Sequence, residues 1–254
     1  MVQTINQAAS LRGTVSLPAD KSISHRSAIL SALGDGRSRV YNFPNSADPQ
    51  STLDCVRTLG IEAGRNDEGV LAIDGRGLGG LHPPSEPLDC GNSGTTMRLL
   101  TGVMAGQEFG SVLTGDESLQ QRPMERIADP LKAMGARINL RSGHAPIRVR
   151  PQQGGLRPLE YRLPVASAQV KSCVLLAGLY ASGRTVVIET TPSRDHTERM
   201  LGLEVEEVGG ERHIIVEEGH TVPAVDWSVP GDFSGAAFFL VAGTLVPDSE
   251  LHLD

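Results

Sequence analysis

The order of apolar and polar positions repeats along this chain. In each repeat an apolar strand end leads into a short polar turn rich in Ser, Gly or Asp, and the turn leads into an apolar segment that ends in glycine. The four occurrences are LPADKSISHRSAILSALGDG from Leu17, LDCGNSGTTMRLLTGVMAG from Leu88, LPVASAQVKSCVLLAGLYASG from Leu163 and VPGDFSGAAFFLVAG from Val229. Their spacing of roughly 70 residues indicates one folding unit that is used several times.

The same further elements follow each of the first three turns. A strand rich in β-branched or apolar residues comes first, as RVYNF from Arg39, SVLTG from Ser111 and TVVIE from Thr185. A second helix has apolar residues three and four apart, as STLDCVRTLG from Ser51, MERIADPLKAMG from Met124 and DHTERMLGLEVEEVGG from Asp195. Two further strands close each unit, seen as VLAIDG from Val70, PIRVRP from Pro146 and HIIVEEG from His213. These elements predict an α/β fold of three complete β-α-β-α-β-β units around a pseudo-threefold axis.

Two segments are interpreted separately. The charge run GLEVEEVGGE from Gly202 is expected to be the solvated end of the third of these second helices. The fourth copy supplies only a strand, a helix and the start of ELHLD before Asp254. Because such a unit cannot bury its apolar face alone, we expect a chain that is truncated relative to the complete fold.

Composition and charge exclude several classes of protein. The chain has 254 residues, with 30 acidic and 23 basic side chains and a net charge of -7, which argues against a broad nucleic-acid-binding face. The longest nearly apolar run, Ala236 to Val246, is well short of the roughly 20 residues that span a bilayer, so no membrane association is expected. The first residues lack the basic and apolar regions of a secretory signal, which predicts a cytoplasmic protein. The three cysteines, Cys55, Cys90 and Cys173, are expected to be reduced and largely buried.

No cofactor or metal is predicted. Gly75, Gly77 and Gly80 spell G-x-G-x-x-G, but the prolines of LHPPSEP follow and cannot open the helix that a dinucleotide site needs. The seven histidines show no metal-site spacing. His25 and His196 lie in polar turns at helix starts and are interpreted as exposed capping or packing residues.

The polar turns at the starts of the first helices favour anion binding. They contribute Lys21, Ser22 and Arg26 in the first unit, Asn92, Ser93, Gly94, Thr95 and Arg98 in the second, and Ser167 and Gln169 in the third. A helix start offers unpaired N–H groups and the positive end of the helix dipole. Under threefold symmetry the three starts converge on one anion. Arg122 and Arg194 occupy corresponding turns of the second and third units and are candidate ligands as well.

Six motifs in order carry a family resemblance. LPADKSISHRS, GNSGTTMR, QRPMERI, LPVASAQVKS, PSRDHTERML and VPGDFSGAAF resemble 5-enolpyruvylshikimate-3-phosphate synthase from about Leu11 to the last residue. The KSISHRS, SAQVKS and SRDHTE motifs are similar to the bacterial class often described as glyphosate-tolerant, although Gly94 stands where tolerant members commonly carry alanine. The family transfers the enolpyruvyl group of phosphoenolpyruvate to the 5-hydroxyl of shikimate 3-phosphate and releases phosphate.

The resemblance implies a role for each matching residue. Lys21 would contact both substrates and is the catalytic residue expected within this chain, and Ser22 and Arg26 would hold shikimate 3-phosphate. The residues implied to hold its phosphate and ring are Ser167, Ala168 through its backbone, Gln169 and Arg194. Gly94 and Arg122 would meet phosphoenolpyruvate. The family's two domains imply a complete three-unit domain over residues 16–227, and a partial first domain made of residues 1–15 and 228–254.

The implied mechanism needs groups that these motifs lack. Addition of the hydroxyl to a protonated enol, followed by elimination of phosphate, requires a general acid and a general base. In the family these carboxylates lie beyond the counterpart of Asp254, so the chain alone is expected to be inactive and to need a separate C-terminal portion. Asp232 is interpreted as structural.

Two alternatives stay open. UDP-N-acetylglucosamine enolpyruvyl transferase shares the repeat, but its Lys-Asn pair is Lys21-Ser22 here, and its loop cysteine has no counterpart near Arg122. A non-catalytic anion-binding module is the other.

Overall fold

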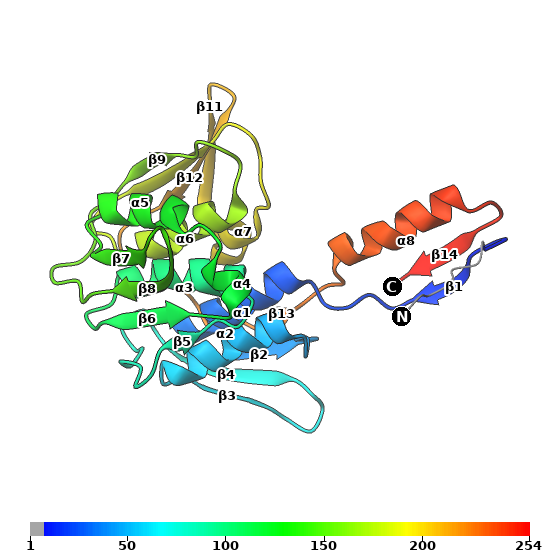
Figure 1. The fold of residues 1–254 in the computed structure, drawn as a ribbon, viewed down its shortest axis with the longest axis horizontal. Coiled ribbons are helices and arrows are strands. Elements are labelled where there is room, and N and C mark those ends of the chain that lie inside the picture. The colour runs from blue at the N-terminus through cyan, green and yellow to red at the C-terminus, as the bar shows by residue number, and fades with distance from the viewer. Residues whose placement is uncertain (1–7) are drawn as a thin grey trace.

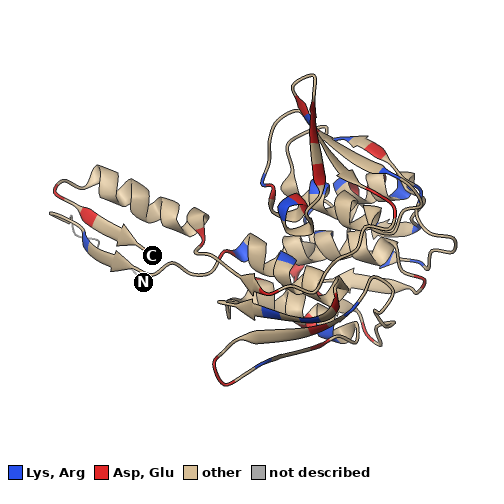
Figure 2. Ribbon diagram, turned by 180° about the vertical axis from the view of Figure 1, so that it is seen from behind, with Lys and Arg blue, Asp and Glu red and all other residues tan. Residues whose placement is uncertain are grey.

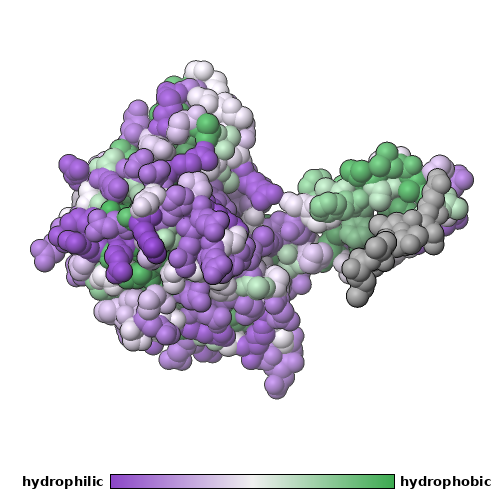
Figure 3. Space-filling view, viewed as in Figure 1, coloured by the Kyte–Doolittle hydropathy of each residue, from purple (hydrophilic) through white to green (hydrophobic). Residues whose placement is uncertain are grey.

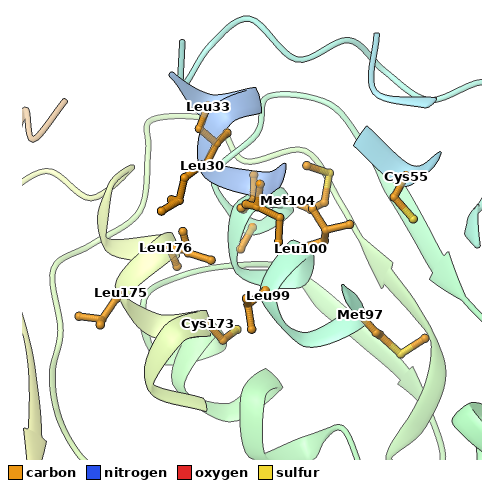
Figure 4. Close-up of a cluster of buried hydrophobic side chains, with 14 of the residues drawn as sticks. Leu30, Leu33, Cys55, Met97, Leu99, Leu100, Met104, Cys173, Leu175 and Leu176 are labelled. Atoms are coloured by element: carbon orange, nitrogen blue, oxygen red, sulfur yellow. The ribbon is translucent and has the colours of Figure 1, made fainter. Parts of the chain in front are cut away.

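Three buried helices form the centre of the molecule. The computed structural model describes residues 8–254, and its central helices are α1 (Lys21–Leu33), α3 (Gly94–Ala105) and α6 (Ala168–Gly178). Each is buried on almost every side, so each is covered by other elements all round. In Figure 4, Leu99, Leu100 and Met104 of α3 lie among leucines of α1 and α6. The close approach of α3 and α6 is possible because Gly102 of α3 has no side chain. A Cβ at this position would overlap the backbone of Cys173 in α6.

Three four-stranded sheets with one topology surround these helices. In each sheet the leading strand pairs in parallel with the second, and the remaining pairs are antiparallel. The second sheet consists of β5 (Leu88–Asp89), β6 (Ser111–Thr114), β8 (His144–Val149) and β7 (Ile138–Arg141). The third consists of β9 (Glu160–Arg162), β10 (Thr185–Glu189), β12 (Glu211–Val216) and β11 (Glu204–Val208). This repetition confirms the predicted α/β units.

The first sheet takes its leading strand from the other end of the chain. Its members are β13 (Trp227–Ser228), β2 (Asp35–Tyr41), β4 (Leu71–Arg76) and β3 (Glu62–Arg65). The segment before the first turn, β1 (Arg12–Val15), pairs instead with β14 (Glu250–Leu253). The first unit therefore departs from the contiguous sequence repeat. Its leading position is filled by β13, which runs parallel to β2.

The predicted helix over the third unit's charge run is wrong. Of the second helices, α2 (Ala47–Thr58) and α5 (Glu125–Ala133) match their predicted positions, and the short α4 (Glu117–Gln120) precedes α5. However, α7 (His196–Leu201) ends after six residues because Gly202 adopts a left-handed φ of 64°. The charge run continues as β11, paired with β12. It is a solvent-exposed strand and not the end of a helix.

A small layer stands apart from this body. Figure 1 shows α8 (Phe233–Leu245), β14 and β1 extending away from the three sheets, to which two adjacent segments connect them. The two segments are joined by backbone hydrogen bonds from Asp20 N to Pro230 O (2.8 Å) and from Asp232 N to Pro18 O (2.7 Å). Figure 3 shows the apolar surface of this layer, on which Phe238 is 80% exposed. No Lys, Arg, Asp or Glu lies within α8 (Figure 2).

The described residues also bear on the predictions for the cysteines, for membrane-spanning helices and for metal sites. Cys55, Cys90 and Cys173 are all buried free thiols, as predicted. Within residues 8–254, no helix has the length and apolar character needed to cross a membrane. The same residues hold no group of three or more His, Cys, Asp or Glu side chains placed to bind a metal ion.

Candidate functional site

The N-termini of the three central helices are joined by side-chain hydrogen bonds. Gln169 of α6 donates through Nε2 to Thr95 Oγ1 of α3, at 2.9 Å. Arg26 of α1 donates through Nη2 to Ser172 Oγ, one turn into α6, at 2.7 Å. Each helix start has a side-chain cap, contributed by Asp20, Ser93 and Ser167. The remaining N–H groups and the dipole ends of three helices therefore lie at one end of the molecule's centre.

Arg26 supports this end of the core from within. It is only 3% exposed, and it donates to Ser22 O (2.9 Å) and through Nε to Thr197 Oγ1 (2.6 Å) as well as to Ser172. Burial lowers the pKa of Arg26 to about 10, so it keeps its charge at neutral pH. Much of its hydrogen-bonding capacity is thus already used by the protein.

Lys21, Ser22 and Arg194 lie at the more open side of the site. Lys21 Nζ forms an ion pair with Asp48 Oδ2 of α2 at 3.0 Å. The exposed Arg194 donates to Ser22 Oγ at 3.1 Å and to Ser234 Oγ, at the start of α8, at 2.9 Å. Arg194 thus contacts both the first turn of α1 and the layer formed by α8.

Two guanidinium groups flank Gly94. A Cβ at Gly94 would lie 2.6 Å from Nη1 of Arg98 and 3.2 Å from Nη1 of Arg122. Arg98 donates to Gln169 Oε1 at 2.7 Å, and Arg122 donates to Asn92 Oδ1 at 2.7 Å. Burial, followed by the charge of Arg122, lowers the pKa of Arg98. Two like charges are therefore held together beside a helix start whose residue has no side chain.

The four arginines of this site form no ion pair with a carboxylate of the described residues. Within residues 8–254, no carboxylate oxygen lies within 4.0 Å of the guanidinium groups of Arg26, Arg98, Arg122 or Arg194. Their partners are hydroxyl, amide and backbone oxygens. Charged donors with only neutral partners are well placed to accept an anion.

The interpretation of His25 as an exposed residue of a helix-start turn is wrong, because His25 lies within α1 and packs in the core, whereas Asp20 caps that helix. His25 is fully buried, with Nδ1 2.6 Å from Thr52 Oγ1, and burial lowers its pKa to about 3. His196 is half-buried at the start of α7, and its pKa is also lowered, mainly by burial. Asp232 caps α8 by accepting from Ser234 N at 2.8 Å, in agreement with its structural interpretation.

Sequence reasoning missed two sets of residues around this site. It assigned no role to Lys171, whose side chain is fully buried between Glu189 and Glu198. A lysine inside the apolar run VKSCVLL was the available signal, because an unpaired ammonium is not buried in a core. It also treated Arg98 only as part of a polar turn, although Arg98 joins the second and third helix starts.

Comparison with known proteins identifies the family. The family model described as EPSP synthase (3-phosphoshikimate 1-carboxyvinyltransferase) matches residues 5–253. The chain belongs to the EPSP synthase family. A 3-phosphoshikimate 1-carboxyvinyltransferase from Salinibacter ruber is 94% identical over 255 residues, covering 100% of this chain and 59% of that protein. The enzyme of the same name from Geobacillus kaustophilus is 50% identical over 262 residues, covering 99% of this chain and 59% of its own length.

A solved EPSP synthase has the same fold. The structure of EPSP synthase from Acinetobacter baumannii matches with a TM-score of 0.84 at 42% identity, covering 95% of this chain and 55% of that chain. The chain thus spans 55 to 59% of the length of these EPSP synthases.

Proposed function

We propose that this chain supplies the helix-start half of an enolpyruvyl transferase site. The reaction is transfer of the enolpyruvyl group of phosphoenolpyruvate to the 5-hydroxyl of shikimate 3-phosphate, with release of phosphate. The observation that carries the proposal is the group of four arginines at joined helix N-termini without a carboxylate partner in residues 8–254. Two substrates that carry phosphate and carboxylate groups supply the missing negative charge.

The contacts favour a division of the site between the two substrates. Ser22, Arg26 and Arg194 are connected through α1, and Arg26 also contacts α6. We assign these three residues to shikimate 3-phosphate, together with Ser167, the backbone of Ala168 and Gln169 at the start of α6. Gly94 and Arg122 lie together at the start of α3, and we assign them to phosphoenolpyruvate. Lys21, at the first position of α1, is assigned to both substrates.

The proton transfers are assigned to groups outside the site formed by these residues. Its nearby carboxylates are already engaged: Asp20 caps α1, Asp48 pairs with Lys21, and Asp116 accepts from Asn92 and Leu119. A general base needs a carboxylate within reach of the 5-hydroxyl. We propose that it comes from the part of the longer relatives that this chain does not match.

The chain is proposed to divide between two domains and to act with a partner. We propose a substrate-binding domain over residues 16–227, and a second domain to which residues 1–15 and 228–254 belong; β13 stands at the boundary between them. Residues 1–7 lie outside the described residues. The pairing of β1 with β14 and the exposed apolar face of α8 support this division. A separate C-terminal portion would cover α8 and complete the site.

Phosphate release tests the proposal. The chain is incubated with both substrates alone, and then with a separately produced portion corresponding to the rest of the Salinibacter ruber relative. We expect no phosphate above background from the chain alone, and release when both portions are present. Lys21→Ala should abolish the restored activity, which excludes a contaminant. If the chain alone turns over both substrates and Lys21→Ala removes this activity, the assignment of the proton-transfer groups is contradicted. If activity is not restored when both portions are present, the proposal that the two portions together form the site is contradicted.

A further inference from the structure

A buried charge cluster lies directly behind the turn that carries Arg194. Lys171 of α6 donates through Nζ to Glu189 Oε2 at the end of β10 (3.0 Å) and to Glu198 Oε1 of α7 (2.7 Å), and none of these side chains is more than 1% exposed. Arg212 of β12 approaches the same oxygen of Glu189 at 3.3 Å. Four elements therefore meet through one set of charges.

The second oxygen of Glu189 holds the turn itself. Glu189 Oε1 accepts from the backbone N–H of Ser193 at 3.1 Å and from the hydroxyl of the same residue. Ser193 directly precedes Arg194 in the chain. The carboxylate thus links the buried ammonium of Lys171 to the backbone that carries Arg194.

A second branch of the cluster leads to Arg26. Glu198 follows Thr197, whose hydroxyl oxygen accepts from Arg26 Nε at 2.6 Å. The segment from Ser193 to Glu198 is therefore fixed at both ends, and each end leads to one of the arginines without a carboxylate partner. Glu189 itself contacts neither Arg26 nor Arg194 in the described hydrogen bonds and ion pairs; the arginine that it contacts is Arg212.

Stability alone is a poor explanation for such a cluster. Moving charges out of water costs free energy that their attraction recovers only in part, so well-packed apolar residues are often as stable. What a buried ion cluster provides is a defined arrangement of the groups it joins. A binding side chain on a turn that is already held loses less freedom when the ligand arrives.

We propose that Glu189 is a positioning residue of the anion site: by holding Ser193 it presents Arg194 to the phosphate of the substrate. The proposal rests on the assignment of Arg194 to shikimate 3-phosphate. Lys171 and Arg212 supply the positive charge that faces the other oxygen of Glu189. A neutral amide at this position cannot accept from Ser193 and from Lys171 through both of its terminal atoms.

A double-mutant cycle tests the link between Glu189 and Arg194. Binding of shikimate 3-phosphate to the full chain is measured by calorimetry for the wild type, Glu189→Gln, Arg194→Ala and the double variant. We expect Glu189→Gln to weaken binding of shikimate 3-phosphate about tenfold when Arg194 is present, and less than twofold in the Arg194→Ala background. Glu206→Gln removes a carboxylate from the exposed pair with Arg184 and should change binding less than twofold.

Glu189→Asp provides a second variant if Glu189→Gln does not fold. It keeps the negative charge beside Lys171 but shortens the reach to Ser193, and we expect the same coupling to Arg194. Equal weakening by either Glu189 variant in the presence and absence of Arg194 overturns the proposal, because it is the result of a general structural defect.

Amide hydrogen exchange without ligand separates this proposal from the proposed function. We expect faster exchange at Ser193 in both Glu189 variants and unchanged exchange at Thr96, the N–H of which is capped by Ser93. If the wild type does not bind shikimate 3-phosphate but Ser193 exchange accelerates as expected, the substrate assignment is wrong and the holding of the turn by Glu189 stands. Unchanged exchange at Ser193 overturns the role of Glu189 whatever the ligand does.

Discussion

Arg122 and Arg194 occupy corresponding turns of two repeats, but their surroundings differ. Arg122 lies beside Gly94 and Asn92, whereas Arg194 contacts Ser22 and Ser234. We therefore expect Arg122→Ala, in the enzyme completed by its C-terminal portion, to raise KM mainly for phosphoenolpyruvate. Arg194→Ala should raise KM mainly for shikimate 3-phosphate. Loss of a charge-assisted hydrogen bond corresponds to roughly 30- to 150-fold for the affected substrate. Equal effects of both variants on both substrates contradict the division of the site.

Gly94 leaves the space in which two guanidinium groups lie. A methyl group there would sit 2.6 Å from Arg98 Nη1, so at least this side chain has to move. We expect Gly94→Ala to weaken use of phosphoenolpyruvate about tenfold, since displaced cations contact the anion less well. Gly235→Ala is the matched control, because its Cβ would meet atoms only at 3.9 Å. Steady-state kinetics of the completed enzyme distinguish the two, and an unchanged KM for phosphoenolpyruvate in Gly94→Ala contradicts the expectation.

His25 gives the stability a defined pH dependence. Burial lowers its pKa from 6.5 to about 3, so the unfolded chain takes up a proton below about pH 6.5 while the folded chain does not. Stability is therefore complete above this pH and is lost as the pH falls, by about 2 kcal/mol between pH 7 and 5. Urea unfolding at both values measures this loss. His25→Gln should lose less stability over the same interval, and an equal loss rules out His25 as the group responsible.

At this scale the sequence pointed to candidate residues near helix starts, the buried Arg26 among them, and missed Lys171, which lies deeper in the core. Lys21, Ser22, Arg122 and Arg194 are visible because polar residues interrupt an apolar pattern at a helix start. Lys171 meets its two carboxylates only after α6, β10 and α7 have packed together. Its partners are 18 and 27 residues away in sequence, and no local pattern relates them.

The packing of α3 against α6 depends on a close approach at Gly102. Because a Cβ there would overlap the backbone of Cys173, Gly102→Ala has to push the two helices apart. We expect this substitution to lower the free energy of unfolding by about 1 to 3 kcal/mol. Gly235→Ala in α8 has room for its methyl group and should be neutral or slightly stabilising. Denaturant unfolding of both variants measures the difference, and similar values for the two contradict the close approach.

The elements predicted from the sequence are those whose patterns are local. The central helices and the strands that follow them come from apolar runs bounded by polar turns, and they are present where expected. The error at β11 arose because Val205 and Val208 fit a helical spacing, whereas Gly202 ends α7 and backbone pairing with β12 decides the strand. The exchange of β1 for β13 could not be read from the repeat, because strand pairing across roughly 190 residues leaves no local signal.

The exposed apolar residues of α8 bear on the association of the whole chain. Phe238, Val241 and Leu245 recur three and four residues apart, and Phe238 and Leu245 are 80% and 76% exposed. An exposed apolar stripe of this kind favours association. We expect the sedimentation coefficient of the chain to rise with concentration, and Phe238→Asp to reduce this dependence. A monomer at every concentration, with and without the substitution, contradicts the expectation.

The most direct measurement is an NMR titration that follows the chemical shifts of the backbone amides of the chain as shikimate 3-phosphate is added at low salt. We expect saturable shifts at millimolar ligand that concentrate at Ser22, Gln169 and Arg194, and that weaken as salt screens the charges. The affinity is expected to be weak because, in the proposed function, the part of the longer relatives that this chain does not match contributes to the site. Absence of shifts at millimolar ligand, or shifts confined to residues away from the three helix starts, would contradict the claim that these helix N-termini and their arginines form the substrate site.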